Sequence, residues 1–326
     1  MARERRRSAR KKSTRRSSFT ATTISRDLGL RHRLSKSKPK SKLSYSETKS
    51  TRSKQSISTT DTAFPDIAFQ NGILNPVCSE PPINLKSHQE RINKSRSTAS
   101  PSESDYQQFA SAIQRAPNKA SVLIETAAHL LKRFDDPWYQ KSFNQAFTNF
   151  PKNVGFNNNL STTQPDMIEG LDMPAFRPFP IREQLGGAAT VYSGPQATTL
   201  PHLAGEWKGP GKDMILAQVQ AGYDGACMVY SRNEARLFLK SPDPADYAFV
   251  STFTIDGTIL NTFAHYSSES EGQVKYHQYP TSSSFLLLSY EDFKTGRQRL
   301  RNLQDDAKET SEKLRDELNK KWSANR

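Results

Sequence analysis

The sequence contains little cysteine and no long hydrophobic run, and both shortages argue against whole classes of protein. Only two cysteines, Cys78 and Cys227, occur among 326 residues, so a disulfide framework is not expected and a reducing compartment is favoured. No apolar run approaches the roughly 20 residues that a membrane-spanning helix needs. We therefore expect a soluble protein without a secretory leader or a membrane span.

Two familiar ligand-binding patterns are also missing. Histidines and cysteines do not cluster at zinc-ligand spacing, and His202 and His265 each stand alone beside apolar residues. The segment "GPGK" (209–212) lacks the Walker pattern, because Glu206 stands where a glycine is required and Lys212 is followed by Asp213. Neither a zinc site nor a phosphate loop is expected.

Acidic residues are scarce at the N-terminus. Residues 1–60 contain 19 lysines and arginines against 3 acidic residues, whereas the remaining 266 residues contain 28 against 30, so the net charge of +14 belongs to the tail. The tail is rich in Ser and Thr and poor in aliphatic residues, and such a segment cannot bury enough surface to offset chain entropy. We expect residues 1–100 to be a disordered basic tail. Its adjacent arginines favour a nuclear import signal or a phosphate-binding arm, with the cytoplasm as the alternative location.

Helical patterns begin near residue 101, and we expect one domain over residues 101–326. Ser102 begins a helix, and helical spacing continues in two segments that are split at Ala116-Pro117. Residues 212–239 are apolar enough for a mostly buried helix with Asp213 in its first turn. Ser289 and Asp292 form a capping-box variant that starts a long C-terminal helix with one apolar stripe.

Strand patterns alternate with these helices. Residues 200–208 ("LPHLAGEWK") favour a strand, and residues 247–268 favour a hairpin whose two-residue turn is Asp256-Gly257. The interleaved order predicts an α/β or α+β domain, with a mixed sheet flanked by helices.

The strand at 200–208 carries the strongest candidate site. Side chains two residues apart share one face of a strand, so Glu206 and Lys208 point together while Trp207 points to the core. An acid and an amine at a strand end suit phosphodiester hydrolysis, because magnesium binds carboxylates together with substrate phosphate and an ammonium can offset developing negative charge. A second acid is available at Asp166, with Glu169 close behind.

The order of these residues resembles the PD-(D/E)XK, or restriction-endonuclease-like, superfamily. Asp166 follows a proline, Glu206-x-Lys208 ends a later strand, and the next helix carries Gln220 and Tyr223. The longer runs at 164–171, 200–235 and 284–307 resemble a family of uncharacterised fungal proteins built on a domain of unknown function, over about residues 100–326.

The resemblance implies a restriction-endonuclease-like core and a metal-dependent nuclease. Asp166 and Glu206 would hold Mg²⁺ or Mn²⁺, Lys208 would be the catalytic lysine, and Gln220 and Tyr223 would contact a DNA or RNA substrate. The alternative is a catalytically inactive protein with the same fold, which binds a partner through its surface or its tail. The oligomeric state is left open.

The sequence departs from the superfamily in two places. Gln220 and Tyr223 are three residues apart, whereas the RecB-like branch has four, and forty residues separate Asp166 from Glu206. The intervening segment must leave the sheet if Asp166 is to reach Glu206. We expect Tyr223 and Trp207 to pack in the core, and we do not expect them to stack on nucleic-acid bases. Whether Asp166 reaches Glu206 therefore separates an enzyme from an inactive relative.

Overall fold

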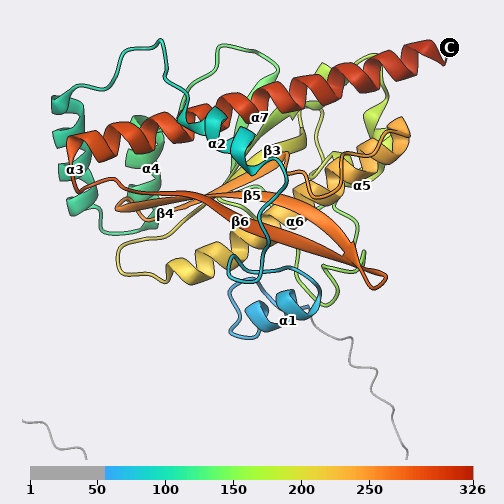
Figure 1. Cartoon of the computed structure of the whole chain (residues 1–326), viewed down its shortest axis with the longest axis horizontal. Coiled ribbons are helices and arrows are strands. Elements are labelled where there is room, and N and C mark those ends of the chain that lie inside the picture. The colour runs from blue at the N-terminus through green and yellow to red at the C-terminus, as the bar shows by residue number, and fades with distance from the viewer. Residues whose placement is uncertain (1–55, 326) are drawn as a thin grey trace, which may run out of the picture. The chain divides into compact units, whose positions relative to one another are not determined.

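A computed structural model describes residues 56–325, and these residues fold around one six-stranded mixed sheet (Figure 1). The strands follow one another across the sheet in chain order, and only β3 and β4 pair in parallel. Their bounds are β1 Tyr139–Phe143, β2 Met167–Asp172, β3 Thr198–Trp207, β4 Val250–Ile255, β5 Ile259–Ser270 and β6 Gln273–Phe285. The expected disorder of residues 1–55 lies outside the described residues.

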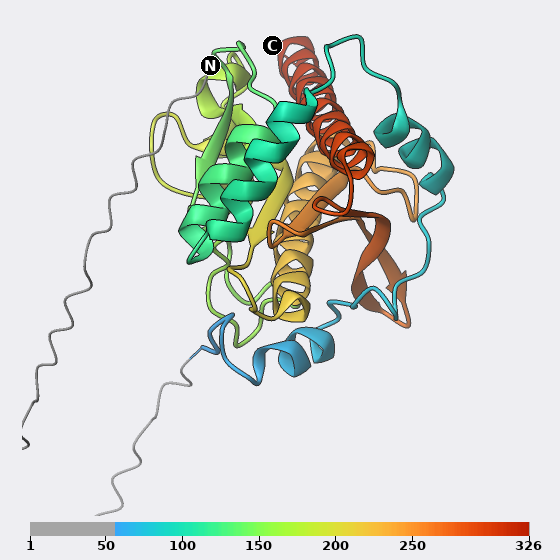
Figure 2. The ribbon, with the colours of Figure 1, turned by 90° about the vertical axis from the view of Figure 1, so that its left-hand side faces the viewer.

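Helices cover both faces of the sheet. α6 (Met214–Leu239) connects β3 to β4 along one face, which is the kind of crossover that a parallel strand pair requires. α7 (Tyr290–Ala324) crosses the opposite face, and α3 (Glu103–Arg115) and α4 (Lys119–His129) lie side by side near its beginning (Figures 1 and 2). No helix within residues 56–325 is both long and apolar enough to span a membrane. The prediction of a mixed α/β fold with a flanked sheet and a long C-terminal helix is confirmed.

α3 and α7 begin at their predicted capping residues, and α6 begins one residue after Asp213, which was expected in its first turn. The Ser102 hydroxyl accepts from Asp105 N while the Asp105 carboxylate accepts from Ser102 N, which completes a capping box for α3. The Ser289 hydroxyl accepts from Asp292 N at the start of α7, and the Asp213 carboxylate accepts from Ile215 N at the start of α6. Local sequence therefore determines where these helices begin.

Alternating side chains divide the core into two layers. Residues such as Ile168 of β2 and Ala204 of β3 pack toward α6, whereas Met167, Leu203 and Trp207 pack toward α7 and α4. β3 is buried on both faces along its whole length. A charged side chain near the end of this strand is therefore surrounded by protein.

The described structure contains two helices before residue 101, α1 (Phe64–Gln70) and α2 (Leu85–Asn93), in the segment that was expected to be a disordered tail. Phe64 and Ile92 are almost fully buried, and α2 packs along α7, where Asn302 Nδ2 donates to Ile92 O at 2.9 Å. Composition missed these helices because their few apolar residues are buried against the large domain.

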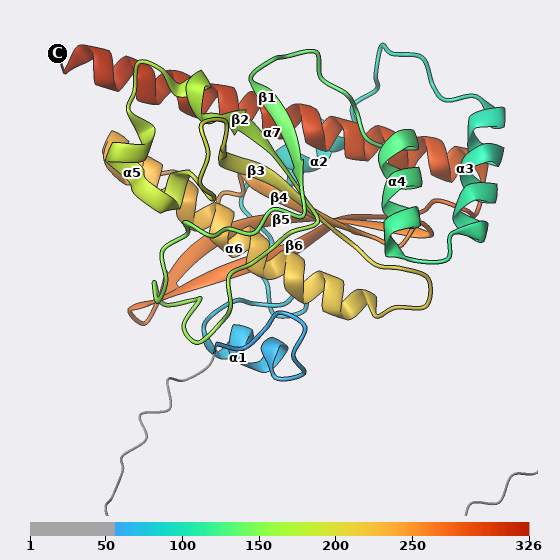
Figure 3. The same cartoon turned by 180° about the vertical axis from the view of Figure 1, so that it is seen from behind.

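The segment between β2 and β3 leaves the sheet, as an Asp166–Glu206 pairing requires. After β2 the chain forms a short 3₁₀ helix (Met173–Phe176) and α5 (Ile181–Ala189), which packs on α6. The chain then re-enters the sheet as β3, which pairs antiparallel with β2. Figure 3 shows this excursion beside α6, viewed from behind.

Candidate functional site

Sheet register brings Asp166 and Glu206 together. Met167 pairs with Gly205 in the antiparallel β2–β3 ladder, so the adjoining Asp166 lies opposite Glu206. Directly opposed residues of antiparallel strands have side chains on one face. Asp166 Oδ2 also accepts a hydrogen bond from Trp207 N at 2.7 Å, which fixes Asp166 at the end of β3. Both acids are buried, with 3% and 4% of their surface exposed.

A third carboxylate, Asp224 of α6, joins them. Thr163 Oγ1 donates to Asp224 Oδ1, and Asp224 Oδ2 is buried without a hydrogen-bond donor among the described residues. The neighbouring Glu206 carboxyl can share a hydrogen bond with Asp224 only when one of the two acids is protonated. We call Asp166, Glu206 and Asp224 the carboxylate cluster.

Sequence reasoning missed Asp224, although a signal was present. It is a single acid in the apolar run "QAGYDGACMV" (220–229), and it lies four residues after Gln220, on the same side of the helix. In the RecB-like branch, the residue four positions after the glutamine is a tyrosine. The carboxylate there adds negative charge that the predicted pair did not include.

Burial controls the charge of the cluster. Desolvation raises the pKa of Glu206 well above its usual range, and the nearby Asp224 and Asp166 raise it further. Burial also raises the pKa of Asp224 to about 7, although the hydrogen bond from Thr163 and the contact with Glu206 lower it. The cluster therefore retains protons near neutral pH, which a bound cation would displace.

Two lysines approach the cluster from opposite sides. Lys208 Nζ lies 3.9 Å from Glu206 Oε2 and donates to Gln220 Oε1. Burial lowers the pKa of Lys208, Glu206 opposes that shift, and Lys119 adds to it. Lys119, the first residue of α4, places its Nζ 2.6 Å from Asp166 Oδ1. Lys119 was not predicted, because the segment that carries it lies far from the motif in sequence.

The glycine after Lys208 explains how α4 comes so close. A Cβ built on Gly209 would lie 2.9 Å from Lys119 N, a separation that real Cβ contacts do not show. Only glycine allows the chain leaving β3 to pass the start of α4. The "GPG" segment therefore places Lys119 at the cluster.

Gln220 and Tyr223 occupy different surroundings. Gln220 accepts from Lys208, and its Nε2 donates to Thr59 O at 3.2 Å, so it positions the lysine. The Tyr223 ring is buried against Phe64 and Phe156, and its hydroxyl donates to Ser161 O at 3.0 Å. Tyr223 is thus a core residue, as first expected, and its contact with substrate stays a prediction.

Glu169 lies on the other face of the sheet. Its carboxylate accepts from Gln304 Nε2 of α7 at 2.6 Å and lies 3.4 Å from Lys141 Nζ. Burial raises the pKa of Glu169 to about 7. Glu169 is close to Asp166 in sequence but does not join the carboxylate cluster. The two residues are three apart, and because side chains alternate between the faces of a strand, Glu169 points toward α7.

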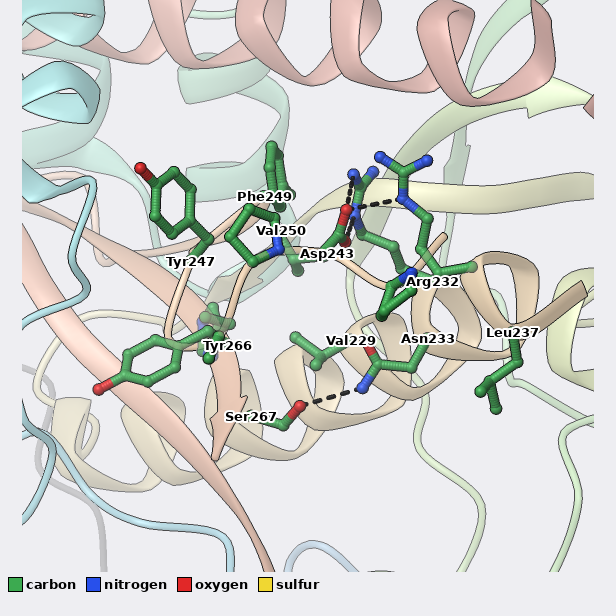
Figure 4. Close-up of a pocket in the computed structure, with 15 residues that line it drawn as sticks. Val229, Arg232, Asn233, Leu237, Asp243, Tyr247, Phe249, Val250, Tyr266 and Ser267 are labelled. Atoms are coloured by element: carbon green, nitrogen blue, oxygen red, sulfur yellow. Dashed lines mark hydrogen bonds and ion pairs between the residues drawn. The ribbon is translucent and has the colours of Figure 1, made fainter. Parts of the chain in front are cut away.

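A second charged cluster lies farther along α6, beside a cavity of about 310 Å³ (Figure 4). Asp243 bridges two arginines, at 2.5 Å from Arg232 Nε and 2.6 Å from Arg236 Nε. Arg232 also donates to His202 Nε2 at 3.0 Å and stacks on Phe249. We call Arg232, Arg236 and Asp243 the arginine cluster.

The carboxylate cluster provides ligands of the class that a hard divalent cation prefers. Its donors are carboxylate oxygens, and Asp224 Oδ2 is available. No three Asp, Glu, His or Cys side chains within residues 56–325 form a ready-made metal site. Lys119 and the Trp207 amide already engage both Asp166 oxygens. The residues fit a cation provided that Lys119 releases Asp166 and the cluster loses its protons.

A scan against protein-family models and a search of curated proteins both gave no match for this chain. The function is therefore inferred from the carboxylate cluster and its two lysines.

Proposed function

We propose that this protein is a metal-dependent phosphodiesterase that hydrolyses nucleic acid. The observation that carries the proposal is the convergence of three buried carboxylates and two lysines at the end of β3. More acids than bases meet there, and one carboxylate oxygen has no donor. Once these acids lose their protons, the excess of buried negative charge is stabilised by a cation. A mixed sheet with helices on both faces also supports the resemblance to the PD-(D/E)XK superfamily.

The proposed roles follow from the contacts. Asp166, Glu206 and Asp224 would hold Mg²⁺ or Mn²⁺, which would supply positive charge to offset the charge that develops on the phosphate oxygens. Lys208 Nζ, whose pKa is lowered by burial, accepts a proton from the attacking water. Lys208 must therefore be the neutral amine before this step, and it becomes the ammonium. Water oxygen bonds to phosphorus, and the bond from phosphorus to the leaving sugar oxygen breaks with its electron pair on that oxygen, which takes a proton from solvent. Gln220 Oε1 accepts from Lys208 Nζ and so holds the amine in place.

Lys119 has a separate role in the proposal. Its Nζ neutralises Asp166 and its side chain is 43% exposed, so it can turn toward an incoming phosphate. The basic residues 1–60 would raise the local concentration of nucleic acid through contacts with phosphates. A nuclear location would agree with this substrate.

The test is metal-dependent cleavage by the full chain. Single- and double-stranded DNA and RNA are incubated with the protein and Mg²⁺ or Mn²⁺, beside the variants Asp166→Asn, Glu206→Gln, Asp224→Asn and Lys208→Met. We expect wild-type cleavage of at least one substrate and a loss of about 100-fold or more in each variant, in the range of single charge-stabilising groups. The full chain is required because residues 56–100 belong to the fold.

Glu169→Gln is the matched control, since it removes a buried carboxylate from the other face of β2. We expect it to retain cleavage. Absence of cleavage on all four substrates would overturn hydrolysis. That result would favour the inactive binding protein, an alternative that the Lys119–Asp166 ion pair supports because it neutralises a metal ligand.

A further inference from the structure

A polar cavity of about 700 Å³ lies next to the carboxylate cluster. Thr163 lines this cavity and donates to Asp224 Oδ1, so one residue belongs to both sites. Tyr223 and Cys227 of α6 form part of the wall, and the remaining wall comes from Ser56 and from the segment between β1 and β2. The volume is within the range of roughly 300–1,000 Å³ that small-molecule sites occupy.

The cavity wall combines aromatic rings with neutral hydrogen-bonding groups. Phe147, Phe150 and Tyr223 contribute rings that are almost fully buried, and amides and hydroxyls make up most of the remaining lining. Among the described residues that line the cavity, Lys152 alone is charged. This composition suits a flat, polar and nearly neutral group, and it does not suit a row of phosphates, which basic side chains bind.

The segment between β1 and β2 is held in place by its own hydrogen bonds. Asn157 Nδ2 donates to Pro151 O at 2.7 Å, its Oδ1 accepts from Val154 N, and Phe147 N donates to Thr163 O at 3.0 Å. By contrast, the side chains of Asn153, Asn159 and Thr162 make no hydrogen bond within residues 56–325, and all three are exposed at the cavity. Their amides and hydroxyl are therefore available to a ligand.

We propose that this cavity binds one unstacked nucleoside unit of a single-stranded nucleic acid. The base lies against the available amides and hydroxyl, which can pair with the edges of a base as such groups do in single-strand recognition. The phosphate attached to it then lies near Thr163 and the carboxylate cluster. A base inside a duplex could not enter, so the cavity selects single-stranded or frayed substrate. The choice of a nucleoside unit as the ligand rests on the proposed function.

The experiment uses free nucleosides, which carry no phosphate. Adenosine, guanosine, cytidine and uridine are titrated into the full chain in EDTA, and binding is followed by saturation-transfer NMR. Neither the basic tail nor a cation contributes to the binding of a neutral nucleoside, so the result is independent of cleavage. We expect saturable binding of at least one nucleoside, and weaker binding of ribose alone.

Two variants locate the binding site. Thr162→Trp fills the cavity from an exposed position, and Asn159→Gly removes an amide while keeping the positive φ of 60° that glycine adopts freely. We expect Thr162→Trp to weaken nucleoside binding by about tenfold or more and Asn159→Gly by a smaller factor, since one hydrogen bond contributes about 1 kcal/mol. Thr258→Trp, in the exposed turn between β4 and β5, is the matched control and should bind as the wild type does.

The possible negative results of the binding experiment can be told apart. If no nucleoside binds to the wild type, the inference is overturned while metal-dependent cleavage keeps its own test. If binding is unchanged in both Thr162→Trp and Asn159→Gly, the nucleoside site lies elsewhere and the inference is likewise overturned. Cleavage without nucleoside binding would separate the two proposals.

Discussion

The arginine cluster, in the second half of α6 and the loop after it, and the carboxylate cluster, at the end of β3, differ in how their charges are balanced. In the arginine cluster, Asp243 bridges Arg232 and Arg236, and Arg236 also pairs with Glu317 of α7. In the carboxylate cluster, three acids face two lysines, and Asp224 Oδ2 has no donor among the described residues. A balanced buried cluster joins elements of the fold, whereas an unbalanced one retains the capacity to bind a ligand. The predictions below test this difference, from the largest expected effect to the smallest.

The arginine cluster should matter most for stability. Asp243→Asn leaves two largely buried guanidinium groups without their shared carboxylate, and breaking a buried ion pair costs about 3–5 kcal/mol. Urea unfolding measures the loss. Asp246→Asn, three residues on and without an ion pair in the described structure, should change stability by about 0.5 kcal/mol or less. Equal losses in the two variants would contradict a structural role for the bridge.

The carboxylate cluster should instead respond to cations. Mg²⁺ or Mn²⁺ at about 100 times its dissociation constant should stabilise the wild-type protein by about 2.7 kcal/mol, because a ligand that binds only the folded state adds that amount. Asp224→Asn should abolish this gain, and Glu169→Gln should keep it. Unfolding curves with and without EDTA provide the measurement. A full cation response in Asp224→Asn would show that the ion binds at another place.

The carboxylate cluster should also make the stability of the folded protein depend on pH. Burial raises the pKa of Asp224 from 3.8 to about 7, so the folded protein keeps a proton there that the unfolded chain has released. The stability from this group is complete below about pH 4 and is lost as the pH rises through about 7, by up to about 1.4 kcal/mol per pH unit.

Asp224→Asn should remove that decline, although Glu206 titrates together with Asp224 and shares it. Free energies of unfolding measured across this range for both proteins give the difference. Glu169→Gln removes a decline of the same sign, because burial also raises the pKa of Glu169 to about 7, so only added Mg²⁺ separates the two acids. Identical pH profiles for the wild type and Asp224→Asn would contradict a proton held at the cluster.

The smallest stability effect is expected at Lys119. Its side chain is 43% exposed, and exposed ion pairs contribute about 1 kcal/mol or less. Lys119→Met should nevertheless tighten cation binding, because it frees Asp166 Oδ1, whereas Lys119→Arg should leave cation affinity near the wild-type value. Manganese titration monitored by water-proton relaxation gives the affinities. Weaker binding in Lys119→Met would mean that the lysine supports the cation and does not compete with it.

Local sequence patterns were sufficient for much of the fold. Ser102 and Ser289 begin the helices that their caps predicted, and the Asp256-Gly257 turn joins β4 to β5. Glu206 and Lys208 do lie together at the end of β3. These features depend on backbone geometry over a few residues, so short stretches contain the information that specifies them.

The domain boundary and the rest of the site were not available from such patterns. Phe64 and Ile92 lie in a polar segment, and only burial against α6 and α7 gives them a place in the core. Lys119 reaches Asp166 because Gly209 lets α4 approach β3. These contacts join residues that are far apart in the chain, and no local pattern records which distant partner each will meet.

By itself the sequence indicated several of the helices and strands, the acid and lysine at the end of β3, and a basic N-terminus, because these follow from residue type and short-range periodicity. The tertiary structure alone decided that Asp166 meets Glu206, that Asp224 joins them, and that Glu169 faces away. Sheet register and the crossover of α6 set those positions. Burial then set their charge, since desolvation depends on what surrounds a carboxyl group and not on its neighbours in sequence.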